Sequence, residues 1–315
     1  MTATLFYVRF VLRFLTGGPH VRRALFVLVV LAAAVVAPTA SPSQLIDRNA
    51  QGIKLEVNTK GEALLTYSAA GKLKHVLAWG ALNAIAPTRS RAQLAFSLDY
   101  AGGWGKYHAD YYKTFKNACR PYDGPALGWF VAGCKAPDGS YWALQSWQKM
   151  LPNYGVAPSG TQAAWELHLS HWTGALPTLT IKTDWAWHQW DHLFGTFTYD
   201  GTGVFGFSAT PGGNPLDTFG RNVYVDTFNS VYGPGWKREN SFLTHLNTGA
   251  FCYSVNPHGS HPAGKGEKYR ATVIGPGVTP DAFWQGNSPG AYDKATDLLA
   301  NDEINQLGDT KCKGN

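Results

Sequence analysis

The segment Asp184–His192 holds the densest group of side chains that could do chemistry, with three tryptophans, two histidines and two aspartates. Alternate side chains of a β-strand share a face, so an extended segment would interleave indole rings with hydrogen-bonding groups. Exposed rings can stack on sugar faces while polar neighbours bind hydroxyl groups and fix the orientation. We therefore expect a ligand site formed by Asp184, Trp185, Trp187, Trp190 and Asp191.

Two other interpretations of this segment stay open. As a helix, it would place His188 and His192 one turn apart, which is a spacing that zinc ligands use. However, Gln189 and Asp191 occupy positions where the corresponding zinc-protease motifs carry a glutamate base, so we predict no metal site. Alternatively, the rings fill the space between two sheets, because buried aromatic side chains dominate many β cores.

Paired carboxylates are the second chemistry to consider, since glycosidases need two carboxyl groups roughly 5–5.5 Å or 6.5–9.5 Å apart. Glu166 is the best single acid because it lies on an alternating segment with Trp165 and His168. Asp226, on the polar side of Val223–Phe228, is the second. Each also fits a solvated strand face. The chain has no Gly-x-Ser-x-Gly, P-loop or Rossmann glycine pattern, so the sequence favours a protein that is neither an enzyme nor a cofactor carrier.

The residues before Ser41 have the pattern of an export signal. Arg22 and Arg23 precede the apolar run Ala24–Ala37, and small residues follow it. This pattern predicts that residues 1–40 form a leader that is removed near Ser41, so that the protein is secreted or lies at the cell surface. The apolar run is shorter than the ~20 residues of a membrane span. An uncleaved anchor that borrows flanking residues is the alternative.

The formal net charge of +6 comes mostly from the leader. Four arginines and no acidic residue occur among the first forty residues, so the remainder of the chain is close to neutral. No basic stripe follows downstream, and this balance argues against nucleic-acid binding. The partners that we expect are a glycan or a cell-envelope component, with the membrane contacted only through the N-terminal segment.

Short alternating segments predict β-strands along most of the remaining chain. Ile53–Val57, Glu62–Ser68 and Leu73–Trp79 are separated by turn residues and form a meander. Leu127–Val131 and Tyr141–Trp147 flank a Pro-Asp-Gly turn, which is a strong hairpin signal. We predict an all-β fold, an antiparallel sandwich or jelly-roll-like structure of about a dozen strands.

Only the C-terminal end looks helical. Ser288 can cap a helix, Pro289 suits its first position, and Ala291–Leu299 carries apolar residues at helical spacing. We expect one short C-terminal helix. Residues 41–315 then form one β-rich domain. The stretch 150–160 is either an internal boundary or one long connection within a single sandwich.

Four cysteines, an even number in a chain with an export signal, indicate two disulfides. Cys119 and Cys134 enclose a short Pro-Tyr-Asp-Gly-Pro turn, so we expect them to pair. Cys252 would then join Cys312 and tie the C-terminal tail to a strand. Each bond contributes ~3–4 kcal/mol in the chain-entropy model. No Cys-x-x-Cys pair is present, which argues against a zinc site built from cysteines.

Two functions from different classes follow from these observations. The first is an exported β-rich protein whose aromatic surface binds a glycan or a cell-envelope partner. The alternative is a secreted hydrolase that acts on polysaccharide through a carboxylate pair in a tryptophan-lined cleft. The exposure of the three indoles in Asp184–His192 bears most directly on the binding hypothesis.

Overall fold

The computed structural model describes residues 43–86, 93–149, 164–187, 190–204, 220–255 and 266–308. The chain divides into a unit of residues 1–39 and a unit of residues 40–315, and every described residue belongs to the second. The predicted leader and Ser41 therefore lie outside the described residues. Within the described ranges, no helix has both the length and the apolar composition needed to cross a membrane.

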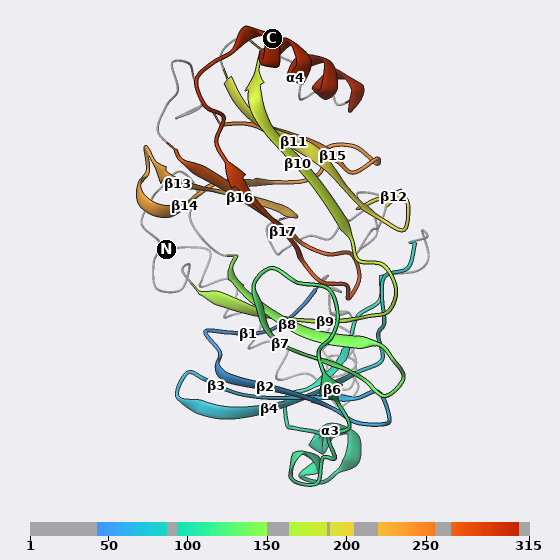
Figure 1. Ribbon diagram of the computed structural model, residues 1–315. Helices are drawn as coiled ribbons and strands as arrows, with labels where there is room; N and C mark the ends of the chain where they lie inside the picture. The colour runs from blue at the N-terminus through green and yellow to red at the C-terminus, as the bar shows by residue number, and fades with distance from the viewer. Residues whose placement is uncertain are drawn as a thin grey trace, which may run out of the picture. The chain divides into compact units, whose positions relative to one another are not determined.

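The regular structure in the described part of the chain is mostly β, as predicted (Figure 1). Seventeen antiparallel strands form four sheets, and one longer helix, α4 (Lys294–Gln306), lies near the C-terminus. The strand count exceeds the expected dozen partly because β6 (Arg120–Pro121) and β12 (Thr202–Gly203) are only two residues long. Two short helical turns, α3 (Trp104–Tyr107) and η1 (Tyr111–Lys113), follow β5 (Ser97–Asp99).

Two sheets are built from the N-terminal half of the described chain. The first sheet has the order β1-β9-β8-β7-β6, with bounds Gln44–Arg48 (β1), Trp165–Trp172 (β9), Tyr141–Gln148 (β8) and Phe130–Lys135 (β7). The second is the predicted meander, β2 (Gln51–Val57), β3 (Ala63–Ala69) and β4 (Lys72–Trp79), extended by β5.

Alternating apolar residues on these strands enclose one hydrophobic core. Leu65 and Tyr67 of β3 and Trp142 and Leu144 of β8 are all fully buried in it. The period of two places every second side chain of each strand inward. Each large side chain removed from water in this way contributes roughly 1.5–3 kcal/mol, which explains why these strands pair as sheets that share one core.

The other two sheets come from residues 178–287. The third contains β10 (Thr178–Ala186), β11 (Trp190–Tyr199) and β12, with β15 (Ala250–Ser254) also paired to β11. The fourth has the order β14 (Gly233–Phe242), β13 (Val223–Ser230), β16 (Lys268–Val273) and β17 (Ala282–Asn287). A second core, which includes Phe197, Phe251, Val225 and Tyr269, joins them.

Helix α4 starts later than the sequence pattern suggests. Asp293 caps it, because the Asp293 side chain accepts a hydrogen bond from the backbone N–H of Thr296 at 2.8 Å. Ser288, the expected cap, instead donates from its hydroxyl group to the carbonyl oxygen of Gly266. Ala300 and Ile304 supply the buried face of the helix, so residues beyond the expected apolar stripe contribute much of its packing.

Polar contacts join the two pairs of sheets. Trp147 Nε1 donates to Asp281 Oδ2 at 2.9 Å, and Gln145 Nε2 donates to the carbonyl oxygen of Asp281 at 2.9 Å. Residues 150–160, the candidate internal boundary, lie outside the described residues. The strands on either side of them, β8 and β9, pair with each other. The chain passes from the first sheet to the third between Trp172 and Thr178.

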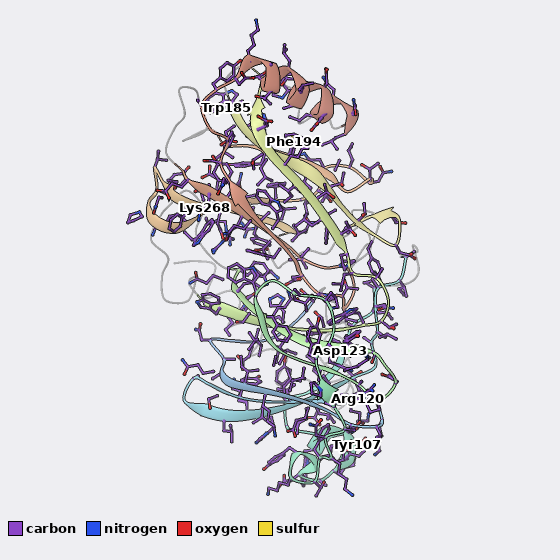
Figure 2. The ribbon with its side chains drawn as sticks, viewed as in Figure 1. Tyr107, Arg120, Asp123, Trp185, Phe194 and Lys268 are labelled. Atoms are coloured by element: carbon purple, nitrogen blue, oxygen red, sulfur yellow. A yellow bond between two sulfur atoms is a disulfide. The ribbon has the colours of Figure 1, made fainter. Side chains whose placement is uncertain are left out.

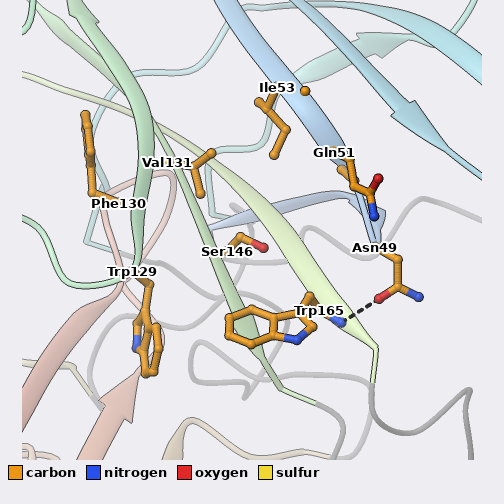
Figure 3. A pocket seen from close by; sticks show the side chains of 10 residues that line it. Asn49, Gln51, Ile53, Trp129, Phe130, Val131, Ser146 and Trp165 are labelled. Atoms are coloured by element: carbon orange, nitrogen blue, oxygen red, sulfur yellow. Dashed lines mark hydrogen bonds between the residues drawn. The ribbon is translucent and has the colours of Figure 1, made fainter.

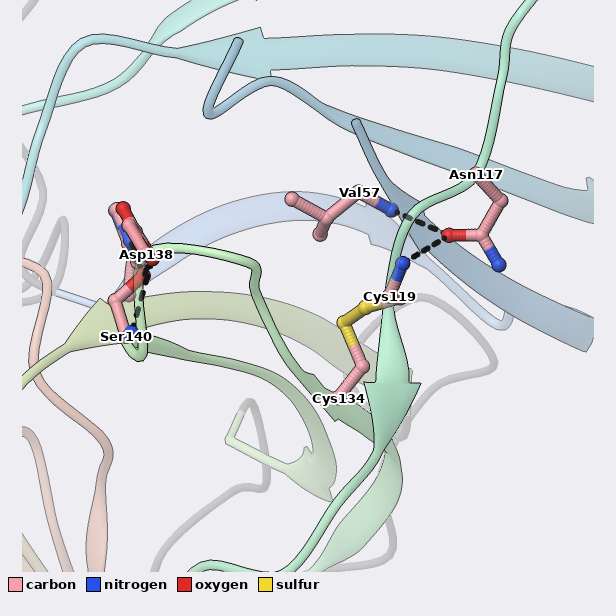
Figure 4. The surroundings of a disulfide bond; sticks show 7 residues. Val57, Asn117, Cys119, Cys134, Asp138 and Ser140 are labelled. Atoms are coloured by element: carbon pink, nitrogen blue, oxygen red, sulfur yellow. Dashed lines mark hydrogen bonds between the residues drawn. A yellow bond between two sulfur atoms is a disulfide. The ribbon is translucent and has the colours of Figure 1, made fainter. Parts of the chain in front are cut away.

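One predicted disulfide is present in the described residues. Cys119 and Cys134 are bonded, with their Cα atoms 5.7 Å apart (Figure 4). Asn117 orders the chain beside it, since its Oδ1 accepts hydrogen bonds from the backbone N–H groups of Val57 and Cys119. Cys252 is disulfide-bonded as well. Its expected partner, Cys312, lies outside the described residues, so that pairing stays a prediction.

Candidate functional site

The described residues of Asp184–His192 lie at the paired ends of two strands. Strand β10 ends at Ala186 and β11 begins at Trp190, with Trp185 opposite Asp191 in the register. His188 and Gln189 lie outside the described residues. Within the described ranges, no cluster of three or more His, Cys, Asp or Glu side chains is arranged to hold a metal ion.

The tryptophans of this hairpin do not present a shared exposed row. Trp185 is only 2% exposed, and its Nε1 donates to the carbonyl oxygen of Gly290 at 3.0 Å (Figure 2). Trp187 is half-buried against a cluster that includes Ala300 and Ile304 of α4, and its backbone N–H donates to Asn301 Oδ1 at 2.7 Å. Trp190 is also half-buried. The ring of Trp187 therefore packs against the base of helix α4, while the ring of Trp185 contacts the segment just before the helix.

The two acids of the hairpin are not arranged beside an exposed ring. Asp184 is half-buried, and Asp191 is buried and accepts a hydrogen bond from the hydroxyl group of Tyr269. Burial raises the pKa of Asp191 well above its usual value, against the effect of that hydrogen bond. A ligand role for the residues of Asp184–His192 stays a prediction, with Trp185 buried and Trp187 and Trp190 half-buried.

Glu166, the first candidate catalytic acid, is a buried and ion-paired carboxylate. Arg48 Nη2 lies 2.8 Å from its Oε1, and Lys149 Nζ lies 3.8 Å from its Oε2. Burial acts to raise its pKa, but the hydrogen bond with His168 and the charge of Lys149 hold it at about 2. A general acid must carry a proton near the working pH, which a carboxyl group of this kind does not.

Asp226, the second candidate, is also buried between cations. Arg238 Nε lies 2.5 Å from Oδ1 and Arg270 Nε lies 2.8 Å from Oδ2. Asp226 belongs to the fourth sheet and Glu166 to the first. Both carboxylates are thus built into separate networks of paired charges, where removing one partner would leave a buried charge uncompensated.

A hydrogen-bonded chain of Ser43, His168 and Glu166 has the residue types of a hydrolytic triad. Ser43 Oγ lies 3.0 Å from His168 Nδ1, and His168 Nε2 lies 3.4 Å from Glu166 Oε2. All three side chains are buried. A nucleophile must reach its substrate, so this arrangement acts as a structural polar network that anchors β1 to β9.

The structure instead places exposed aromatic side chains around a groove of about 660 Å³. This size lies within the ~300–1,000 Å³ typical of small-molecule sites. We call it the β2–β7 groove. Its lining comes from residues 49–53 at the start of β2, residues 129–131 at the start of β7, Ser146 on β8 and Trp165 on β9.

Two β-bulges shape the sides of the β2–β7 groove. On β7, Phe130 pairs with Gln145 and Ala132 with Leu144, so Val131 is an additional residue. On β2, the register shifts between Gln51 and Lys54. A bulge bends its strand and redirects side chains. Here it lets Phe130 and Val131, which follow one another in the chain, both remain about 40% exposed at the groove.

Trp129 holds an uncommon backbone conformation at one side of the groove. Its φ of 59° is left-handed, which is rare for a bulky residue and marks strain held by surrounding contacts. Its Nε1 donates to Thr272 Oγ1 at 3.1 Å, and its carbonyl oxygen accepts from the N–H of Ser146 at 2.9 Å. Gly128, before it, packs so closely on Phe283 that an added Cβ would lie 2.6 Å from the Cγ of that ring.

Trp165 is the most accessible indole of the groove, at 42% exposure. Its backbone is fixed, because its N–H donates to Asn49 Oδ1 at 3.0 Å and its carbonyl oxygen accepts from the N–H of Asn49 at 2.7 Å. Asn49 also has a left-handed φ, of 52°. Figure 3 shows Trp129 and Phe130 on one side of the groove and Asn49 and Gln51 on the other.

The side chains that line the β2–β7 groove are uncharged. Among its ten lining residues, none carries an ionisable side chain, while two amides and one hydroxyl group provide hydrogen bonds. In the sequence, Trp165 stands out only as the neighbour of Glu166, and residues 129–131 only as part of a strand. The signal that could have revealed the groove is the run Trp129–Val131, where three large apolar residues break the strand alternation.

The geometry of the β2–β7 groove combines exposed rings, facing amides and a ligand-sized volume. Compared with models of protein families, with curated proteins and with solved structures, the chain matches none of them.

Proposed function

We propose that this protein is an exported, β-rich carbohydrate-binding protein whose ligand lies in the β2–β7 groove. The observation that carries the proposal is the pairing of exposed rings with amide side chains across an uncharged groove of ligand size. A pyranose ring has an apolar face and an edge of hydroxyl groups. Indole faces suit the first and amides suit the second, and such a mixture of apolar surface with a few placed polar groups is typical of ligand sites.

The strained and bulged backbone supports the same proposal. Trp129 and Asn49 both have left-handed backbone angles, and both line the groove. Such conformations persist where surrounding contacts enforce them, and they cluster at ligand sites. The groove is therefore held in shape before a ligand arrives, which lowers the entropic cost of binding.

The hydrolase alternative receives less support at this groove. Cleavage of a glycosidic bond needs a pair of carboxyl groups beside the sugar, and none of the ten lining residues of the groove is an acid. Glu166 follows Trp165 directly, but its carboxylate is buried with Arg48 and Lys149. Binding without cleavage fits these positions better.

The direct test compares Trp165→Ala with Trp104→Ala. Trp104 lies on α3 and is 53% exposed, so its replacement controls for loss of an exposed indole away from the groove. With titration calorimetry against a panel of neutral oligosaccharides, we expect Trp165→Ala to weaken binding by roughly 1–3 kcal/mol, about 5- to 150-fold in Kd. Equal affinities of the two variants, or a wild-type protein that binds no carbohydrate, neutral or charged, soluble or insoluble, would contradict the proposal.

Export is part of the proposal and has its own measurement. The Arg-Arg pair, the apolar run and the small residues before Ser41 support secretion or cell-surface placement. N-terminal sequencing of protein recovered from a bacterial host should give a mature end near Ser41. Recovery only in the membrane fraction with an intact N-terminus would favour the uncleaved anchor.

A further inference from the structure

The two indole rings of the β2–β7 groove meet at a corner. The ring centres of Trp129 and Trp165 lie 6.2 Å apart and their planes are inclined by 74° (Figure 3). Such an edge-to-face arrangement is a preferred geometry for aromatic pairs. The consequence for a ligand is that no single flat surface can lie against the faces of both rings.

Contacts from the fourth sheet hold Trp129 in this orientation. Phe283 packs edge-on against it with ring centres 5.0 Å apart, and the Arg270 guanidinium lies 4.9 Å from its ring centre. The hydrogen bond from Nε1 to Thr272 fixes the rotation of the ring. Turning Trp129 until it became coplanar with Trp165 would break all three contacts, so these contacts fix the Trp129 side of the corner.

The opposite side of the groove favours hydroxyl groups over charges. Gln51 is exposed there, and Asn49 is held in place by its two hydrogen bonds with Trp165. Two basic residues flank this stretch in sequence, and both are ion-paired: Arg48 with Glu166 and Lys54 with Glu56. A ligand with carboxylate or sulfate groups would find no cationic partner among the lining residues, whereas a neutral sugar would find two amides.

This inference rests on the proposed function. The geometry points to a narrower ligand class, a single neutral glycan chain or its end. The flat face of a packed polysaccharide does not belong to this class. One sugar ring stacks on the exposed face of Trp165, and Trp129 closes the groove beside it. The sugar hydroxyl groups on the far edge face Asn49 and Gln51. A planar array of chains would need coplanar rings on an open surface, and this corner excludes it.

The experiment measures the binding of soluble and insoluble glycans to the same protein preparations. Cellohexaose, chitohexaose, maltohexaose, xylohexaose and mannohexaose serve as neutral soluble probes in titration calorimetry, and an oligogalacturonate serves as the anionic probe. Microcrystalline cellulose and chitin serve as packed probes in depletion assays. The variants are Trp165→Ala, Gln51→Ala and the control Trp104→Ala, each checked for wild-type circular dichroism and melting temperature.

We expect at least one neutral hexasaccharide to bind, with affinity lowered roughly fivefold or more by Trp165→Ala and lowered by Gln51→Ala, while Trp104→Ala leaves it unchanged. Retention on the crystalline polymers should be absent. If the crystalline polymers retain the protein through Trp165 and no soluble hexasaccharide binds, this inference is overturned and the proposed function is left intact. Tighter binding of the oligogalacturonate than of every neutral hexasaccharide would also overturn this inference and leave the proposed function intact. Failure to bind any carbohydrate would overturn both.

Discussion

Glu239 provides a quantitative test of the packing between the third and fourth sheets. It lies on β14 with its side chain fully buried, and the hydroxyl group of Tyr253 donates to its Oε1 at 3.2 Å. Burial raises the pKa of Glu239 to about 7, although the hydrogen bond from Tyr253 acts in the opposite direction. Asp191 is electrostatically coupled to it, and burial raises the pKa of that carboxyl group too.

The raised pKa of Glu239 sets the sign and size of a pH effect on stability. Between the ordinary value of 4.5 and about 7, the folded state holds a proton that the unfolded state has released. Stability therefore falls as the pH rises through this window. At 1.36 kcal/mol for each pKa unit, the loss amounts to roughly 3 kcal/mol.

Replacing this carboxyl group by an amide should remove the effect. Glu239→Gln keeps the shape and an acceptor for Tyr253 but does not titrate. Any cost of fitting the amide is the same at every pH. His171, whose pKa burial lowers to about 4, contributes an opposite slope over part of the same range. It is present in both proteins and cancels in the comparison.

The assay is urea unfolding of the wild type and Glu239→Gln at intervals from pH 4 to pH 8. At each pH, the free energy of unfolding of the wild type is subtracted from that of the variant. This difference should be about 3 kcal/mol larger at pH 8 than at pH 4, in favour of the variant. Glu267→Gln, at an exposed position, serves as the control for replacing a glutamate by glutamine. A constant difference for Glu239→Gln would refute the reasoning.

Three further predictions concern packing and the groove. Trp185→Ala should lower the free energy of unfolding by about 3–5 kcal/mol, because it empties a buried site, and calorimetric melting measures this. Replacing Cys119 and Cys134 by serine should cost about 3 kcal/mol for a loop of this size and weaken glycan binding, since Trp129 lies within the loop. Gly128→Ala should reduce both the melting temperature and the affinity for glycan, because the added methyl group collides with the side chain of Phe283.

Each of these predictions has a contrary result. Gly290→Ala is the matched control for Gly128→Ala, since an added Cβ there meets no atom within 4 Å, and equal effects of the two changes would contradict the collision. A Trp185→Ala protein with wild-type stability but weaker glycan binding would contradict the packing role and support the hairpin as a ligand site. Unchanged stability of the double serine variant would show that the loop needs no covalent closure.

Much of the fold could be predicted because its signals are local. Alternation in Ile53–Val57, Glu62–Ser68 and Leu73–Trp79 indicates strands, and these segments form the meander β2–β4. The short loop between Cys119 and Cys134 favours their pairing, which is present. The C-terminal helix was expected, but its start was not, because Ser288 and Asp293 are both good caps and only the surrounding chain selects Asp293.

The candidate site could not be read from local patterns in the same way. Asp184–His192 is the richest segment in chemistry, yet Trp185 is buried in a contact with Gly290, far along the chain. Trp165 is adjacent to a buried Glu166 and is itself exposed at the groove. Whether a ring is packed or available depends on which strand or helix covers it, and that cover comes from residues distant in sequence.

The sequence by itself determined the β class, the main turns and the Cys119–Cys134 pairing, because alternation and turn chemistry act between near neighbours. The tertiary structure alone decided which tryptophans are exposed and how they face one another. The corner between Trp129 and Trp165 depends on a bulge in β7, on a left-handed backbone angle and on contacts from Thr272. Strand registers and contacts between sheets create these features, and a linear pattern of residue types does not encode them locally.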